Sequence, residues 1–258
     1  MEGRNLLIAL SVKHKGDWQT IYKDIVNRTY LSEEMVEEIL KFDYTCLTLL
    51  DNEYPERVKK SYRPPFVIYY EGNAEYLKDD MLSVLNENLA SDYAFKSLLK
   101  VCEDLIKDKT FVIQYGSKKN NEIIKRLIAK GGKVVAVLDR GIRNADDREL
   151  YEELVNNHLV LSIYPNQVVS RNTETEIATN SLIATLSSSL LIGGITDKSP
   201  ISTAVAFGLS QGAHIYCIPF PIGNHYMNNQ LIKDGAMLVE NGSDILIRKE
   251  NYEDRREK

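Results

Sequence analysis

The sequence predicts an α/β fold with a doubly wound, mostly parallel sheet and a small N-terminal helical module. The main evidence is the stretch 181–246, where short apolar runs alternate with helix starts and small-residue turns. Parallel strands covered by helices on both faces typically give this pattern. A second observation is that three of the 14 glycines lie before residue 110 and the other eleven follow it. The chain therefore divides into a helical first part and a turn-rich second part.

The helical module is predicted over residues 1–44. Two short amphipathic helices are expected there, at 17–28 and 32–41. In the second, Ser32 is suited to the N-cap position and acidic residues follow in the first turn. Because two short helices bury little apolar surface, we expect the module to dock onto a larger domain.

Residues 45–80 are predicted to form an extended connector that enters the sheet. Three prolines exclude a continuous helix there, and the run FVIYY favours a strand. Residues 81–247 are predicted to form the doubly wound domain, and 248–258 a charged tail. Alternation of strands and helices with short connections favours a parallel sheet. The expected strands are 111–114, 134–138, 159–163, 190–193 and 215–218, and the expected helices are 92–107, 121–130, 146–157, 174–186 and 200–211.

Composition limits the possible classes. A hydrophobic content of 43% can form a core, and a net charge of -5 means that any contact with a polyanion needs a local basic patch. Three widely spaced cysteines in apolar runs indicate buried thiols in a reducing compartment. The N-terminal apolar run is too short to span a membrane. These two observations lead us to expect a cytoplasmic protein without a membrane segment. Four scattered histidines show no ligand spacing, so we expect no metal, and we expect no cofactor.

Candidate ligand-binding groups follow the expected strands. Backbone amides and two cations converge at Gly116, Lys118 and Lys119, although the spacing is neither that of a P-loop nor of a GxGxxG turn. A solvated turn is the alternative. Ser199, followed by proline, begins a helix whose free N–H groups could hold a phosphate, and a plain capped helix is the alternative.

Basic residues and aromatics give two further candidates. Lys133 and Arg140 flank one strand and could hold two phosphates, unless they only solubilise the sheet edge. The connector mixes cations with aromatics, as surfaces that stack unpaired bases do, although such aromatics more often anchor a linker. These connector residues are Tyr54, Arg57, Lys59, Lys60, Tyr62, Arg63 and Phe66.

No arrangement of residues indicates catalysis. The sequence has no nucleophile elbow and no spacing typical of a Ser-His-Asp, Cys-His or carboxylate-metal site. Paired acids in surface loops are better explained as charged faces. We therefore expect a protein that is not an enzyme.

The order of these segments resembles the DprA/Smf family of DNA-processing proteins. The stretch YPERVKKSYRPPFVIYYEGN is similar to the first conserved segment of that family, with its Tyr-Pro pair, double proline and apolar strand. Five further stretches resemble later family blocks in the same order: GGKVVAVLDRGI, LVLSIYP, NSLIATLSSSLLIGG, STAVAFGLSQGAHIYCIPFP and NNQLIKDGAMLVENGSDIL. The resemblance covers residues 54–246. It implies a Rossmann-like domain, binding of single-stranded DNA, hand-off to a RecA-type recombinase in natural transformation, and a homodimer.

The ligand-binding motifs of that family are altered. Gly-Ser-Arg is replaced by 86–88 (Asn-Glu-Asn), Arg-Asn-Arg by 179–181 (Thr-Asn-Ser), and the acid of Ser-Glu-Tyr-Pro by Ile163. Fewer phosphate contacts imply weaker binding and a smaller salt dependence. The winged-helix tail of many relatives is not expected. The residues predicted to contact DNA are Gly116, Lys118, Lys119, Lys133, Arg140, Gly141, Asn180, Ser199, Thr203 and Asn229.

Two alternatives remain at this point. Related Rossmann-like enzymes act as phosphoribohydrolases on nucleoside monophosphates, but GGITDKSPIST lacks their Pro-Gly-Gly-x-Gly-Thr motif and offers Asp197 in place of a glutamate. A nucleotide-binding protein of that type is one alternative. The other is a paralogue that has lost DNA binding and acts through protein contacts.

Overall fold

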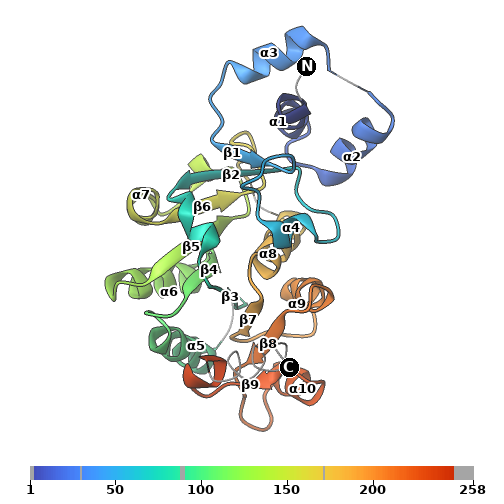
Figure 1. Ribbon diagram of the computed structural model, residues 1–258. Coiled ribbons are helices and arrows are strands. Elements are labelled where there is room, and N and C mark those ends of the chain that lie inside the picture. The colour runs from blue at the N-terminus through green and yellow to red at the C-terminus, as the bar shows by residue number, and fades with distance from the viewer. Residues whose placement is uncertain (1–2, 30, 88–90, 171, 247–258) are drawn as a thin grey trace, which may run out of the picture.

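The computed structural model describes residues 3–29, 31–87, 91–170 and 172–246. These residues form one nine-stranded sheet with helices on both faces, and a helical module lies at one end of the sheet (Figure 1). The predicted fold class is confirmed. The predicted charged tail, 248–258, lies outside the described residues.

The sheet is parallel over most of its width. Its strand order is β1-β2-β6-β5-β4-β3-β7-β8-β9, in which β2 pairs antiparallel with β1 and β6 and the pairs from β6 to β9 are parallel. The strands are β1 (Cys46–Thr48), β2 (Val67–Gly72), β3 (Met81–Leu85), β4 (Thr110–Gln114), β5 (Lys133–Leu138), β6 (Leu159–Ser162), β7 (Ser189–Ile192), β8 (His214–Cys217) and β9 (Met237–Leu238).

Helices connect these strands in the alternating order that the sequence predicts. Side chains cap most of their starts; Ser117 accepts from the Asn120 N–H at 3.1 Å, and Asp147 accepts from the Leu150 N–H at 3.2 Å. The helices are α1 (Gly3–Lys13), α2 (Trp18–Val26), α3 (Glu33–Leu40), α4 (Glu56–Lys59), α5 (Asp92–Asp104), α6 (Lys118–Ala129), α7 (Arg148–Asn157), α8 (Thr173–Leu186), α9 (Ile201–Ser210) and α10 (Asn228–Lys233), with 3-10 turns η1 (Ala74–Lys78) and η2 (Ile142–Asn144).

Two buried clusters cover the two faces of the sheet. Because side chains alternate along a strand, Phe111 and Ile113 of β4 pack with α5, α6 and α7. Val112, between them, packs on the opposite face with α8 and α9. The two layers lie on opposite sides of the strands in Figure 1. The central strands are therefore buried on both faces, which explains their continuous apolar runs.

The segment 45–80 contributes to the sheet itself. It forms β1 and β2, and β2 places Tyr69 opposite Ser162 of β6. The predicted connector therefore extends the sheet by two antiparallel strands. The helical module contains α1 in addition to the two predicted helices, and the buried Ser11 of α1 accepts a hydrogen bond from the Tyr69 hydroxyl at 3.0 Å.

Candidate nucleic-acid interface

The strand order reverses its winding direction beside β3. From β3 the chain moves outward through β4 and β5 to β6, returns by α8, and continues through β7 and β8 on the other side of β3. In open α/β sheets, ligands bind outside the carboxyl ends of the strands at such a switch point. We call the loops at these ends the strand-end surface. It comprises residues 86–87, 115–118, 139–141 and 193–199.

The loops after β3 and β7 are bonded to each other. The Glu87 carboxylate accepts hydrogen bonds from the N–H and the hydroxyl of Thr196, at 3.0 and 3.1 Å. The Glu87 N–H donates to the Gly194 carbonyl at 3.0 Å. Gly193 allows this close approach, since a Cβ atom there would lie 2.7 Å from Asn86 Oδ1. A carboxylate of the chain itself therefore uses donors at the switch point that would suit a bound anion.

The turn after β4 presents one exposed cation. Gly116 has φ 110°, a region that favours glycine, and its N–H donates to Asn121 Oδ1 at 2.8 Å. Lys119 lies 3.6 Å from the Asp92 carboxylate of α5. Lys118 is exposed at the first position of α6. Of the two predicted lysines, Lys118 is the one that no described carboxylate neutralises.

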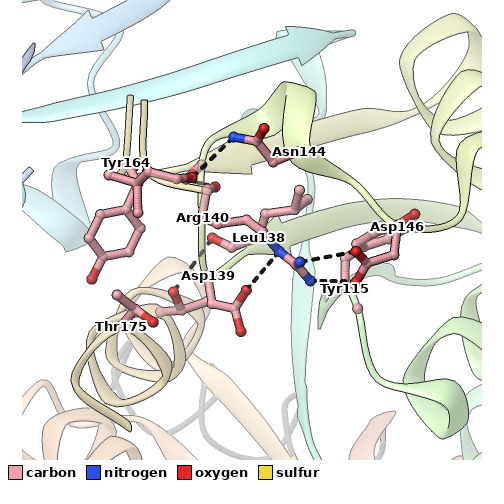
Figure 2. Close-up of polar contacts among 12 residues, drawn as sticks. Tyr115, Leu138, Asp139, Arg140, Asn144, Asp146, Tyr164 and Thr175 are labelled. Atoms are coloured by element: carbon pink, nitrogen blue, oxygen red, sulfur yellow. Dashed lines mark hydrogen bonds and ion pairs between the residues drawn. The ribbon is translucent and has the colours of Figure 1, made fainter. Parts of the chain in front are cut away.

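The cation after β5 is buried between two acids. Figure 2 shows Arg140 bonded to Asp146 through both terminal nitrogens, at 3.1 and 2.7 Å. Its Nε lies 3.4 Å from the buried Asp139 carboxylate. The Arg140 side chain is only 8% exposed, so it is not presented to a polyanion. We therefore assign Arg140 to holding the turn after β5 rather than to direct phosphate contact.

Tyr115 supports the same turn from the end of β4. Its hydroxyl donates to the Asp147 carbonyl at 2.7 Å and accepts from the Asp147 N–H at 3.0 Å. Burial raises the pKa of Tyr115 to about 12, so the hydroxyl keeps its proton at neutral pH. Gly141 packs against the loop after β6, where a Cβ atom would lie 2.4 Å from the Asn166 Cα. Both residues thus shape the surface without offering a free donor to DNA.

Lys133 lies at the end of the sheet where the parallel strands begin, opposite to the strand-end surface. It begins β5, whereas the surface follows the ends of the strands. Its ammonium group forms a 2.9 Å ion pair with Asp79 and lies 5.2 Å from the centre of the Tyr76 ring. The hydrogen bond to Asp79 raises the pKa of Lys133. The structure therefore does not bring Lys133 together with the other predicted contacts, because Lys133 lies where β5 begins and the strand-end surface lies where the strands end.

The remaining predicted residues differ in exposure. Asn180 is buried within α8, and Ser199 is buried and accepts from the Ile201 N–H at 3.3 Å. Thr203 is exposed on the first turn of α9. Asn229 is bonded to both the N–H and the carbonyl of Phe220, at 2.9 and 2.7 Å. Thr203 is the member of this set with an exposed side chain, and Asn229 fixes the loop after β8.

Sequence reasoning missed Asn228, the neighbour of Asn229. Its buried side chain donates to the carbonyls of Ile192, Gly193 and Ile218, at 3.3, 3.3 and 3.0 Å. It also accepts from the Ile195 N–H at 3.2 Å. Asn228 therefore holds the ends of β7 and β8 in place. The pair of adjacent asparagines was the available signal, but it did not indicate which of the two points inward.

Three buried asparagines carry polar atoms with no hydrogen-bond partner among the described residues. These atoms are both amide atoms of Asn86, Oδ1 of Asn120 and Nδ2 of Asn180. Asn86 follows β3, Asn120 lies in the first turn of α6, and Asn180 lies on α8, which packs against β3, β4 and β5. A buried unpaired polar group costs about 1–3 kcal/mol, so its presence at a ligand position calls for a functional explanation.

Other kinds of site have less support. Within the described ranges there is no group of three or more His, Cys, Asp or Glu side chains able to hold a metal ion. The three cysteines are buried and free, and burial raises the pKa of each thiol. None of the described helices has both the length and the apolar content needed to span a bilayer.

Comparison with known proteins decides the family. The family model of DNA recombination-mediator protein A matches residues 45–250, most of the chain. The chain belongs to this family. The DprA/Smf resemblance read from the sequence is therefore confirmed, and the chain is a DNA-processing protein of the DprA type.

Similar proteins support the family and the fold. The DNA processing protein DprA of Streptococcus pneumoniae is 27% identical over 211 residues, which cover 79% of this chain and 73% of that protein. An X-ray structure of DprA from that species has a TM-score of 0.75 at 24% identity, covering 94% of this chain and 92% of that one. A structure of DprA from Helicobacter pylori, reported for its mode of single-stranded DNA binding, has a TM-score of 0.68 at 16% identity. The match covers 81% of this chain and 97% of that one.

Proposed function

We propose that this DprA family member binds single-stranded DNA without sequence preference at the strand-end surface. The observation that carries the proposal is the exposed Lys118 at the start of α6, which no carboxylate of the described residues neutralises, beside the switch point of a DprA-type sheet. Helix starts provide free N–H groups and a favourable dipole for phosphate. The H. pylori relative, described as binding single-stranded DNA, supports the same choice of ligand.

We further propose that the bound strand passes to a RecA-type recombinase in natural transformation. In this proposal the protein acts in the cytoplasm, as a homodimer, and catalyses no reaction. Residues 81–247 form its DNA-binding domain, and 1–44 and 45–80 are the module and connector attached to it. The family resemblance supports the hand-off and the homodimer, and the sequence pattern supports the location and the division into module, connector and domain.

The proposed binding depends on few cations. Arg140 and Lys119 face carboxylates, which leaves Lys118 and the exposed Lys198 of the loop after β7. Each neutralised phosphate of a single strand contributes about 0.7 to the slope of log K against log salt. Two contacts therefore give a slope of about −1.4. We expect weak binding that salt reduces only moderately.

Fluorescence anisotropy of labelled oligo-dT at several salt concentrations tests this proposal. The variant Lys118→Gln should weaken binding and lower the slope by about 0.7. Lys133→Gln, at the start of β5 and away from the strand-end surface, is the matched control and should change neither the affinity nor the salt slope. Undetectable binding of the single strand at low salt, or equal effects of both variants, would contradict the proposal.

A paralogue that has lost DNA binding is the second candidate function. The observation that favours it is the pairing of strand-end cations with acids, together with the bond of Glu87 to Thr196. The same titration separates the two candidates. Binding with a measurable salt slope supports the first, and its absence supports the second.

A further inference from the structure

A groove separates the helical module from the α8 and α9 face of the main domain. Its volume is about 730 Å³. Trp18 and Phe66 line one wall, Phe207 of α9 lines another, and one side of α8 supplies Thr175 and Ser181. We call it the junction groove. It is distinct from the strand-end surface, because its walls come from the module, the connector, the loop after β6 and one side of two helices.

An aromatic ladder runs along this groove. The Trp18 ring stacks on Tyr22 at 4.8 Å between centroids, and the Arg63 guanidinium lies 5.3 Å from the Trp18 ring. The same guanidinium lies 5.2 Å from the Tyr62 ring, which stacks on Phe207 at 6.4 Å. Trp18, Arg63, Tyr62 and Phe207 thus form a continuous row along the groove, and Tyr22 extends this row beyond the groove lining. Rings and guanidinium planes in a row are the surface on which unpaired bases stack.

The connector divides into an anchoring part and a presenting part. Tyr54 is buried and its hydroxyl donates to the Pro65 carbonyl at 2.7 Å, while the Trp18 ring N–H donates to the Pro64 carbonyl at 2.9 Å. These bonds hold the backbone that directly follows Tyr62 and Arg63. Tyr62 is nevertheless 66% exposed. An anchoring role alone does not explain its exposure.

The backbone at Arg63 is unfavourable for its residue type. Arg63 has φ 58°, in the left-handed region that a non-glycine residue adopts at a cost. Backbone outliers of this kind concentrate at binding sites, where surrounding contacts hold them. Here the conformation carries the guanidinium to the Trp18 and Tyr62 rings. The outlier therefore serves the presentation of the ladder.

The charges of the junction groove are balanced. Lys15 and Arg63 contribute positive charge, and Asp17 and Glu174 contribute negative charge. His14 is bonded to Asp24 at 2.8 Å. A balanced groove does not attract a phosphate backbone strongly. Aromatic surface in such a groove suits the uncharged faces of bases.

The groove adjoins the strand-end surface. Tyr164 and Thr175 belong to its lining. Figure 2 shows both side chains beside Asp139, which with Arg140 directly follows β5. A strand whose phosphates contact the strand-end surface can therefore continue into the groove without crossing the body of the domain.

We propose that unpaired bases of a single DNA strand stack on the aromatic ladder of the junction groove. This subsite rests on the proposed single-strand binding and adds a base contact to its phosphate contacts. Stacking is independent of base sequence, since every base has an aromatic face. The subsite also gives the helical module a part in DNA binding, through Trp18.

Trp18 is the only tryptophan of the chain, so its fluorescence reports on this groove alone. The experiment compares oligo-dT with an abasic strand of the same length, which keeps the phosphates and lacks the bases. Oligo-dT should quench Trp18 emission and bind about tenfold more tightly than the abasic strand. Tyr62→Ala should remove most of that tenfold difference and leave binding of the abasic strand and the salt slope unchanged.

The control is Phe42→Ala, which removes an aromatic side chain of similar exposure that lies outside the groove. It should leave both titrations unchanged, and circular dichroism should show that both variants are folded. Equal affinity of the two strands, or equal oligo-dT affinity of the wild type and Tyr62→Ala, overturns the subsite while single-strand binding stands. If the wild type binds neither strand, both the proposed function and the subsite fail.

Discussion

The strand-end surface and the junction groove hold their arginines in different surroundings. At the strand ends, Arg140 is buried against Asp139 and Asp146. In the groove, Arg63 lies against the rings of Trp18 and Tyr62 and is exposed. An arginine paired with carboxylates stabilises its turn and has no charge left for a ligand. An arginine stacked on rings keeps its N–H donors available. The partner, and not the residue type, therefore decides which arginine keeps its donors available for a ligand.

The largest effect should come from removing Arg140. Arg140→Met leaves the buried Asp139 carboxylate without its cation, which should lower the free energy of unfolding by about 3 kcal/mol. The measurement is urea denaturation. Arg126→Met is the control, because Arg126 pairs with Glu122 on an exposed helix face and should cost less than about 0.5 kcal/mol. Equal losses for the two variants would show that Arg140 is not a structural cation.

The next effect concerns the rigidity of the strand ends. Asn228→Ala removes the side-chain hydrogen bonds to three carbonyls and one N–H, and should cost about 2 kcal/mol. Asn229→Ala removes bonds in a less buried loop and should cost about half as much. Thermal unfolding measures both. A larger loss for Asn229→Ala would mean that the loop after β8, and not the switch point, depends on this pair.

A smaller effect, on DNA affinity, should come from removing a negative charge at the strand-end surface. Glu87→Gln removes a negative charge at the switch point and frees donors of Thr196, so oligo-dT affinity should rise several-fold at low salt. Glu75→Gln is the control, because Glu75 lies on the exposed turn η1 at the end of the sheet where the parallel strands begin. It should not change the oligo-dT affinity. Unchanged affinity in Glu87→Gln would show that the strand-end loops do not contact the strand.

The smallest effect should appear at acidic pH beside the groove. The hydrogen bond from His14 lowers the pKa of Asp24 below its usual 3.8. This contribution to stability is present above the pKa of the unfolded chain and is lost as pH falls through the lower folded pKa. Trp18 emission followed from pH 6 downward should therefore change below about pH 4 in the wild type. Asp24→Asn should lack that step, and identical curves would contradict the assignment.

Apolar runs predicted β4, β5, β6, β7 and β8 closely, but β3 (Met81–Leu85) at the switch point was not among the expected strands. The expected strand 111–114 is Thr110–Gln114, and 215–218 is His214–Cys217, displaced by one residue. The helix α1 was missed because Ser11 and Lys13 interrupt its apolar run. Ser11 is nevertheless buried, since the Tyr69 hydroxyl satisfies it from a strand distant in sequence. A long-range partner of this kind leaves no local signal.

The binding residues were less predictable, because their roles depend on partners. Arg140 could be placed at a strand end, but its pairing with Asp146 depends on how η2 turns the chain back. Lys133 could have been assigned to the opposite edge from strand direction alone. Lys118 and Thr203 are exposed on helix starts, so for these two the predicted position and the exposure agree.

The antiparallel pairing of β2 with β6 also limits the order in which the chain can fold. Tyr69 of β2 pairs with Ser162 of β6, which is synthesised much later. While only the first half of the chain exists, β1 and β2 therefore have no β6 to pair with. Contacts between such distant residues slow folding, because a long loop must close first. During synthesis the N-terminal module and its two strands are therefore made first and docked late. A ribosome that pauses before residue 159 would hold a chain whose β2 edge is still unpaired, and such edges are open to pairing with other chains.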